Sequence, residues 1–192
     1  MVRLFSIALG AVTITAVYRI GRLIAPQMTL VAIIAAGLLA VNPMFLFISA
    51  AVNNDNLVTA LAAVVIYLLL LTLRDGFAFR RSLLMAFLIA MATLTKLSGL
   101  VLVPVVAITA IWIGYRDRDW RGLFALGFMM ASIWVLLAGW WYVRNIILYN
   151  ELFGTHMMVQ VAGERPEPFT AATALAEFEG FRWSFCGVFG LF

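Results

Sequence analysis

The stretch SLLMAFLIAMATLTKLSGLVLVPVVAITAIWIGY, residues 82–115, holds the main clue to how this chain folds. It is apolar except at its middle, where Thr95, Lys96 and Ser98 interrupt it. As a single helix its 34 residues would be about 51 Å long, whereas the hydrocarbon core of a bilayer is about 30 Å thick. We therefore predict two short helices joined by a polar turn at residues 95–99, with Pro104 tolerated near the start of the second helix.

Composition places the whole chain in the membrane. Of its 192 residues, 65% are hydrophobic and 11% are charged, and the mean hydropathy is +1.07. Soluble domains are about half apolar and a quarter charged, so this composition excludes a soluble domain. The net charge of +4 comes from basic residues scattered in short clusters, which indicates topology signals and no nucleic-acid partner.

The apolar stretches predict an all-α fold, a polytopic transmembrane helix bundle of about six spans. The six expected spans are Leu4–Ile24, Met28–Val52, Leu57–Leu73, Leu83–Thr95, Leu97–Tyr115 and Leu123–Val143. Residues 1–143 then form the bundle. Residues 144–192 form an external loop, a short helix capped by Thr170, and an incomplete apolar segment.

Basic residues orient the bundle. With a turn at Lys96, three arginine clusters fall on one side, which the positive-inside rule makes cytoplasmic. The clusters are Arg19 with Arg22, Arg74 with Arg80 and Arg81, and Arg116 with Arg118 and Arg121. The C-terminal tail is then external, and we expect the protein to be integral to a bacterial cytoplasmic membrane.

The two ends of the chain leave alternatives open. Residues 1–20 resemble a signal peptide, but no small-x-small cleavage site precedes Tyr18, so we favour a retained helix. The last apolar segment, residues 181–192, is too short to cross a bilayer. We expect a truncated chain or a piece of a larger protein, with a re-entrant final segment as the alternative.

Polar residues at the expected external face are the site candidates. Asn53, Asn54 and Asp55 sit between two spans, where a carboxylate can coordinate a metal or orient a hydroxyl acceptor. Local helix capping explains the same residues. Lys96 is a candidate phosphate partner, and a snorkelling side chain is its alternative.

Arg144 follows the aromatic run Trp140–Tyr142 and opposes the positive-inside trend. It suits a phosphate or diphosphate, while an interfacial anchor or a partner for Glu151 is the alternative. His156 has no second ligand at metal spacing and is expected in a loop. Cys186 is the single cysteine, expected to be a buried structural thiol.

Three motifs together resemble the GT-C membrane glycosyltransferases, in the group of protein mannosyltransferases and aminoarabinose transferases with their bacterial relatives. They are NPMFLFISAAVNND at 42–55, ATLTKLSGL at 92–100 with Pro104, and GWWYVRN at 139–145 with Tyr149 and Gly154. The resemblance covers nearly the whole chain and implies a polyprenyl-phosphate-linked sugar as donor, with transfer at the external face.

The resemblance maps Asp55 onto the second acidic position of the family, as the catalytic candidate. Lys96 and Arg144, with Asn54 and Tyr149, become the candidates for binding substrate or lipid phosphate. No cofactor is certain, and a divalent metal at Asp55 stays open. The family's first helix and acidic external loop have no counterpart before Arg3, so we expect the chain to be inactive alone.

A non-enzymatic structural subunit of a larger membrane protein complex is the competing interpretation, with lipids and other membrane proteins as partners. A transporter is disfavoured because inverted repeats and ionisable residues deep in the spans are not evident.

Overall fold

The computed structural model describes residues 2–163 and 170–185, and every regular element in these ranges is a helix. The elements are α1 (Val2–Ile24), α2 (Thr29–Ala40), α3 (Pro43–Ala50), α4 (Asn54–Asp75), α5 (Phe79–Thr95), the 3-10 helix η1 (Leu97–Val101), α6 (Leu102–Asp117), α7 (Trp120–Tyr149), α8 (Thr155–Ala162) and α9 (Ala171–Phe185). The expected all-α membrane bundle is confirmed.

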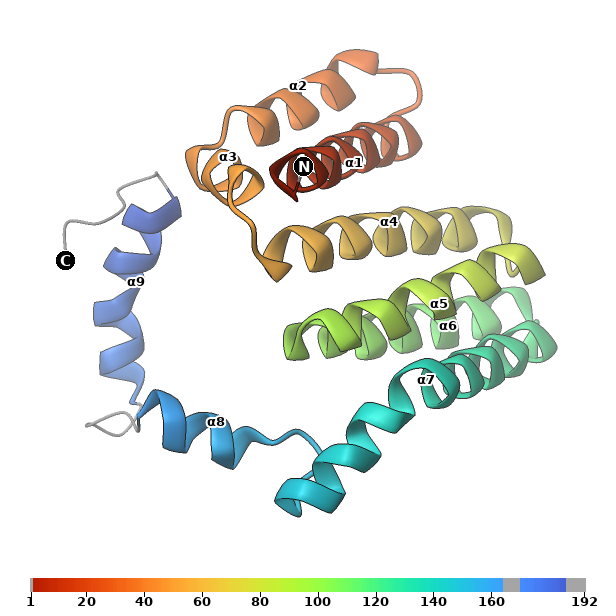
Figure 1. Ribbon diagram of the computed structural model, residues 1–192. Coiled ribbons are helices and arrows are strands. Elements are labelled where there is room, and N and C mark those ends of the chain that lie inside the picture. Colours follow the sequence, from red (N-terminus) through yellow and green to blue (C-terminus); the bar gives the residue numbers. More distant parts are fainter. Residues whose placement is uncertain (1, 164–169, 186–192) are drawn as a thin grey trace.

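Four helical stretches in the described ranges are long and apolar enough to cross a membrane: Arg3–Ile24, Asn54–Asp75, Leu97–Asp117 and Trp120–Tyr149. The bent pair α2 and α3 makes a fifth. The fourth expected span, Leu83–Thr95, corresponds to α5, whose 17 residues reach about 26 Å. It still lies in the bundle, packed between α4 and α7 (Figure 1).

The second expected span is broken where a single helix was predicted. α2 and α3 meet at an angle of 61°. Pro43 occupies the first turn of α3, and Asn42 caps that helix by accepting a 2.9 Å hydrogen bond from the Phe45 N–H. Proline cannot continue α2 because it lacks an N–H and clashes with the preceding turn.

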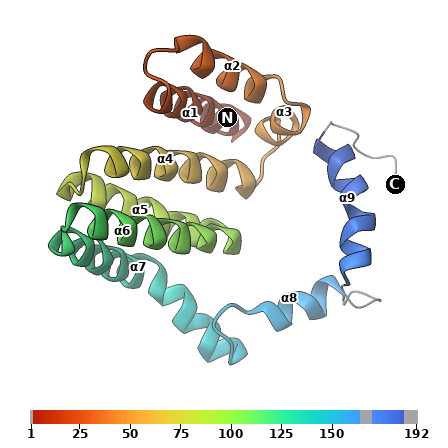
Figure 2. The same ribbon diagram turned by 180° about the vertical axis from the view of Figure 1, so that it is seen from behind.

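The predicted turn in the stretch 82–115 is confirmed. α5 ends at Thr95, Lys96 adopts extended backbone, and η1 leads into α6. α6 runs back toward the end of the bundle at which α5 begins, packs against α4 and α7, and carries Pro104 in its first turn (Figure 2).

The three arginine clusters gather at one end of the bundle, as the charge pattern predicted. α1, α4 and α6 end there, and α5 and α7 begin there (Figure 1). The Arg116 guanidinium donates a 2.8 Å hydrogen bond to the Leu73 carbonyl, so two of the clusters lie on adjoining helix ends. We call this the basic end and the opposite one the outer end.

The tightest part of the core lies among α4, α5, α6 and α7. Val65, Met85, Val106 and Leu126 are almost completely buried there. Outside this core, the backbones of α1 and α2 come close to each other at Gly21 and Ala32. A Cβ on Gly21 would stand only 2.7 Å from the Cα of Ala32, so glycine is needed there. Small residues permit such contacts between membrane helices.

α7 runs past the expected boundary at Val143 to Tyr149, where Asn150 ends it in left-handed conformation. Residues 144–149 contain neither glycine nor proline, so nothing there stops the helix. Arg144 and Tyr149 therefore lie on a helix rather than in a loop.

Beyond α7, the helices α8 and α9 form an arc that returns toward α3 (Figure 1). Thr170 accepts a 3.2 Å hydrogen bond from the Thr173 N–H and so caps α9 at the predicted residue. α9 continues to Phe185, so it includes the first residues of the last apolar segment, 181–192, which was expected to be separate from the short helix. Cys186, expected to be a buried thiol, lies outside the described residues.

Candidate functional site

Asn53 caps α4 at the outer end of the bundle. Its Oδ1 accepts a 3.2 Å hydrogen bond from the Asn56 N–H, and its own backbone is extended. The capping explanation is thus correct for Asn53. Asp55 follows in the first turn, where a carboxylate interacts favourably with the helix dipole.

Asn54 and Asp55 do more than cap the helix. The Lys96 ammonium donates a hydrogen bond to Asp55 Oδ1 and forms an ion pair with it. One residue earlier on each segment, Asn54 Nδ2 donates a 3.1 Å hydrogen bond to the Thr95 carbonyl. These two contacts join two separate motifs of the sequence, residues 42–55 and 92–100.

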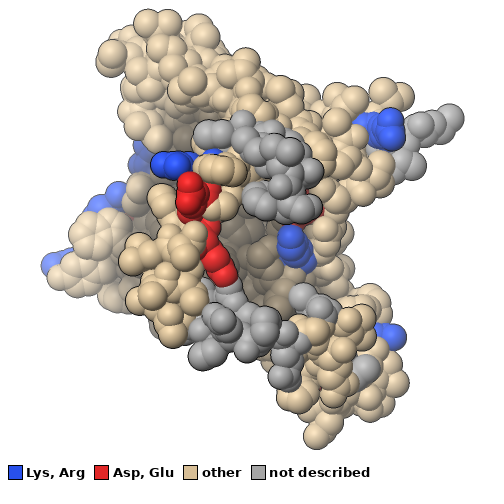
Figure 3. Space-filling view, turned by 90° about the vertical axis from the view of Figure 1, so that its left-hand side faces the viewer, with Lys and Arg blue, Asp and Glu red and all other residues tan. Residues whose placement is uncertain are grey.

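The pair remains accessible. The Asp55 side chain is 36% exposed and that of Lys96 is 43% exposed. An ammonium has three N–H donors, so Lys96 can bind an anion while it contacts Asp55. The space-filling view onto this end shows a hollow bordered by acidic and basic groups (Figure 3).

Gly99 fixes the position of Lys96. Its N–H donates a 2.9 Å hydrogen bond to the Lys96 carbonyl. A Cβ on Gly99 would stand 2.5 Å from the carbonyl carbon of Ala92. The turn can therefore fold back onto α5 only with glycine at this place.

Arg144 is placed differently from Lys96. Its guanidinium carbon lies 5.2 Å from the centre of the Trp141 ring, a cation–π contact. Glu151, its expected alternative partner, instead accepts a 3.0 Å hydrogen bond from the backbone N–H of His156. His156 itself lies in the first turn of α8, not in a loop.

Tyr149 is 38% exposed at the end of α7, and its ring would lie 3.7 Å from a Cβ at Gly154. Within the described residues, neither Arg144 nor Tyr149 is seen in contact with the Asp55–Lys96 pair. The structure thus brings Asn54, Asp55 and Lys96 together and leaves Arg144 and Tyr149 on a neighbouring element.

Sequence reasoning missed a set of partly or fully buried groups on α5 and α7. Trp134 Nε1 donates a 3.2 Å hydrogen bond to Thr93 Oγ1. The Trp134 and Tyr142 rings are 4.7 Å apart, and Tyr142 also contacts Phe153 at 5.9 Å. Trp134 and Tyr142 are eight residues apart, about 12 Å along a helix, so their spacing alone does not predict the contact.

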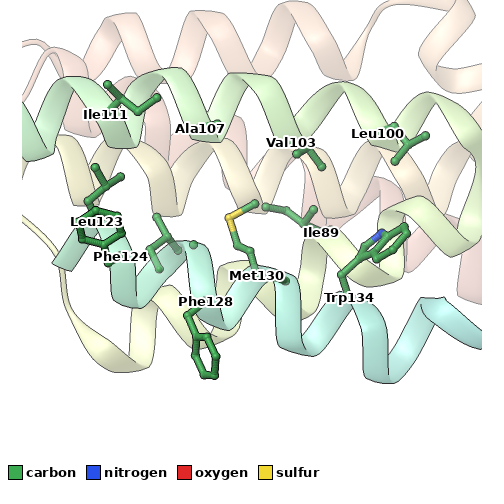
Figure 4. Close-up of a pocket in the computed structure, with 13 residues that line it drawn as sticks. Ile89, Leu100, Val103, Ala107, Ile111, Leu123, Phe124, Phe128, Met130 and Trp134 are labelled. Carbon is green, nitrogen blue, oxygen red and sulfur yellow. The ribbon is translucent and has the colours of Figure 1, made fainter. Parts of the chain in front are cut away.

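An apolar pocket of about 780 Å³ lies between α6 and α7, with Ile89 of α5 at its floor. Leu100 and Trp134 lie at one end of it, and Ile111, Leu123 and Phe124 at the other (Figure 4). Leu100 belongs to η1, the helix that begins directly after Lys96. The pocket therefore extends from the turn that carries Lys96 toward the basic end.

A metal at Asp55 finds little support in the surroundings of that residue. Across residues 2–163 and 170–185, no three His, Cys, Asp or Glu side chains cluster in a way that holds a metal ion. Divalent metals favour several oxygen ligands, and Asp55 already faces an ammonium. Asp55 therefore belongs to no such cluster among the described residues.

The sequence of residues 1–142 matches the dolichyl-phosphate-mannose-protein mannosyltransferase family. That range contains the Asp55–Lys96 pair and the whole pocket between α6 and α7. No curated protein and no solved structure matches the chain.

Proposed function

This chain belongs to the dolichyl-phosphate-mannose-protein mannosyltransferase family of GT-C membrane glycosyltransferases, and we propose that it binds a polyprenyl-phosphate-linked sugar at its outer end. The observation that carries the proposal is that Lys96, paired with Asp55, leads directly into η1, whose Leu100 lines an apolar pocket. A lipid phosphate needs a cation where its head lies and apolar surface where its chain lies. Both occur here on neighbouring elements.

The orientation in the membrane is part of the proposal. The basic end faces the cytoplasm and the outer end faces the external side of a bacterial cytoplasmic membrane. Lys96, Arg144 and the tail helices α8 and α9 then lie on the external side. The sugar is accordingly presented to an acceptor outside the cytoplasm.

The prenyl chain occupies the pocket between α6 and α7. Val103, Ala107 and Met130 among its lining residues offer apolar surface and no charge. The chain exchanges contacts with lipid for contacts with the pocket, so packing rather than removal from water holds it there. The phosphate lies at the Lys96 end, where its charge is matched by the ammonium.

Asp55 and Lys96 divide the chemistry between them. Lys96 binds the donor phosphate with the N–H donors that do not face Asp55, and the Asp55 carboxylate accepts the proton of an acceptor hydroxyl on its other oxygen. The hydroxyl oxygen attacks the anomeric carbon, and the bond from that carbon to the phosphate oxygen breaks. The electron pair leaves on the phosphate, which Lys96 stabilises.

Asn54 positions this pair. Its hydrogen bond to the Thr95 carbonyl holds the start of α4 against the end of α5. Arg144 and Tyr149 are proposed to contact the donor from α7, the helix that also lines the pocket.

The chain by itself is proposed to bind donor without transferring sugar. Within the described residues, Lys96 is the partner seen for Asp55, and no second carboxylate is seen in contact with the pair. The family resemblance implies a further acidic residue on an external loop. Transfer by the purified chain alone would contradict this part of the proposal and leave donor binding intact.

Binding of polyprenyl phosphate, measured by native mass spectrometry in mild detergent, tests the proposal. Lys96→Gln should weaken binding about tenfold, the size expected for a lost charged hydrogen bond. Arg3→Gln removes a charge from the same end of the bundle and should have little effect. An equal loss of affinity in both variants would refute a specific site. If polyprenyl phosphate does not bind and other proteins copurify in stoichiometric amounts, the structural-subunit interpretation is favoured.

A further inference from the structure

A second groove, of about 490 Å³, lies on the membrane-facing surface between α5 and α7. Its lining residues are apolar except for one arginine: Arg80, Leu83, Leu84, Phe87, Leu136 and Leu137 are among them. Arg80 lies in the first turn of α5, at the basic end, and Phe87 is two turns further along. The groove thus has a charged head and an apolar course of about 10 Å along α5.

Arg80 is available to bind an anion. Among the described residues no hydrogen bond or ion pair is seen for its guanidinium, and its side chain is exposed. The nearest carboxylate in sequence, Asp75, is already held by Arg74 at 2.6 Å and by Arg81 at 3.4 Å. Asp75 is therefore engaged by other arginines rather than by Arg80.

The backbone at the same place favours an anion too. Ala78 precedes α5 and provides no side-chain cap, so the N–H groups of the first turn receive no oxygen from a capping side chain. Such N–H groups and the positive end of the helix dipole attract phosphate. They supplement the charge of Arg80.

We propose that this groove binds one anionic glycerophospholipid from the leaflet at the basic end. Arg80 binds the phosphate diester with parallel hydrogen bonds, and an acyl chain lies along Leu83, Leu84 and Phe87 against Leu136 of α7. The groove has the chemistry of this ligand class, a phosphate next to a hydrocarbon chain. A helix of another protein would fill the apolar part without any need for a free arginine at the end.

This site is separate from the proposed donor site. The donor phosphate is assigned to Lys96 at the outer end, whereas Arg80 lies at the basic end, near the turn between α4 and α5. The two grooves also use different lining residues on α7. Either proposal can fail while the other holds.

Native mass spectrometry of the full chain in mild detergent tests the inference, with dioleoyl phosphatidylglycerol and dioleoyl phosphatidylcholine as probes. Phosphatidylglycerol should bind more tightly. Arg80→Gln should reduce its affinity about tenfold, as expected for a lost charged hydrogen bond, and reduce that of phosphatidylcholine less, because choline already balances the charge of the same phosphodiester. Arg19→Gln removes an exposed charge at the same end, away from the groove, and is the matched control.

The chain-binding part is tested with dihexanoyl phosphatidylglycerol, which keeps the phosphate and loses most of the acyl chain. Its affinity should fall well below that of the dioleoyl lipid. Three results would overturn the inference: equal losses for Arg80→Gln and Arg19→Gln, no preference for the anionic lipid, or displacement of phosphatidylglycerol by polyprenyl phosphate. The inference would also be overturned by a copurifying protein that covers Leu136 and thereby excludes the lipid from the groove.

Discussion

Asp55 at the start of α4 and Lys96 at the end of α5 form an ion pair across 41 residues of sequence, at the outer end of the bundle. The contact connects two polar turns between which the chain crosses the bundle twice. It places a carboxylate and an ammonium side by side at the turn that leads into η1, whose Leu100 lines an apolar pocket. A charged pair next to an apolar pocket suits a ligand that is itself charged at one end and apolar along its length.

The ion pair should matter for donor binding more than for stability. Both side chains are more than a third exposed, and exposed pairs contribute about 0–1 kcal/mol. Asp55→Asn and the double variant with Lys96→Gln should therefore unfold within a few degrees of the parent in a thermal scan in detergent. A loss of about 3 kcal/mol or more would show that the pair is a structural element instead.

Replacement of Gly99 in the turn after α5 should destabilise the protein. Gly99→Ala places a Cβ 2.5 Å from the carbonyl carbon of Ala92, so the turn must move, at a cost of about 1–3 kcal/mol. Gly37→Ala in α2 is the matched control, because nothing lies within 4 Å of its added Cβ. Thermal unfolding in detergent should separate the two variants, and equal melting temperatures would contradict the close approach of η1 to α5.

The buried hydroxyl of Thr93 should stabilise the contact between α5 and α7. Thr93→Val keeps the shape and removes the acceptor of the 3.2 Å bond from Trp134. Interhelical hydrogen bonds in membranes contribute about 0.6–1.7 kcal/mol. Thr109→Val is the control, since its exposed hydroxyl bonds to the Val105 carbonyl of its own helix. If the control loses as much stability, the interhelical bond is not the cause.

Filling the pocket between α6 and α7 should weaken binding of polyprenyl phosphate. Ala107→Phe projects a ring from the pocket lining and sterically excludes part of the chain, for a loss of about tenfold in affinity. Ala125→Phe adds the same ring to an exposed position of α7 outside that lining. Unchanged binding by the Ala107 variant would exclude this pocket as the chain site.

The membrane orientation can be measured directly. In a Cys186→Ala background the chain has no other cysteine, so Arg118→Cys and Leu152→Cys each report one end. A membrane-impermeant maleimide should label the Leu152 variant in intact cells and the Arg118 variant only after permeabilisation. The reverse pattern would place the Asp55–Lys96 pair in the cytoplasm.

The class of fold and the break at Lys96 follow from the sequence alone. Apolar runs must become helices in a bilayer, since backbone groups there have no water to bind. A polar turn within 34 apolar residues cannot stay at the centre of the membrane. The arginine clusters likewise predicted which helix ends share one side, and the structure joins two of those ends through Arg116 and Leu73.

The contacts between distant segments depend instead on tertiary packing. Asn54, Asp55 and Lys96 were separate candidates in the sequence, and the packing of α4 on α5 placed them together. Packing of α7 against α5 and α6 likewise formed both grooves and placed Arg80 at the head of one. Composition and spacing describe single helices, whereas grooves and ion pairs depend on how helices pack, which is set by side-chain shape at contacts such as Gly99 against Ala92.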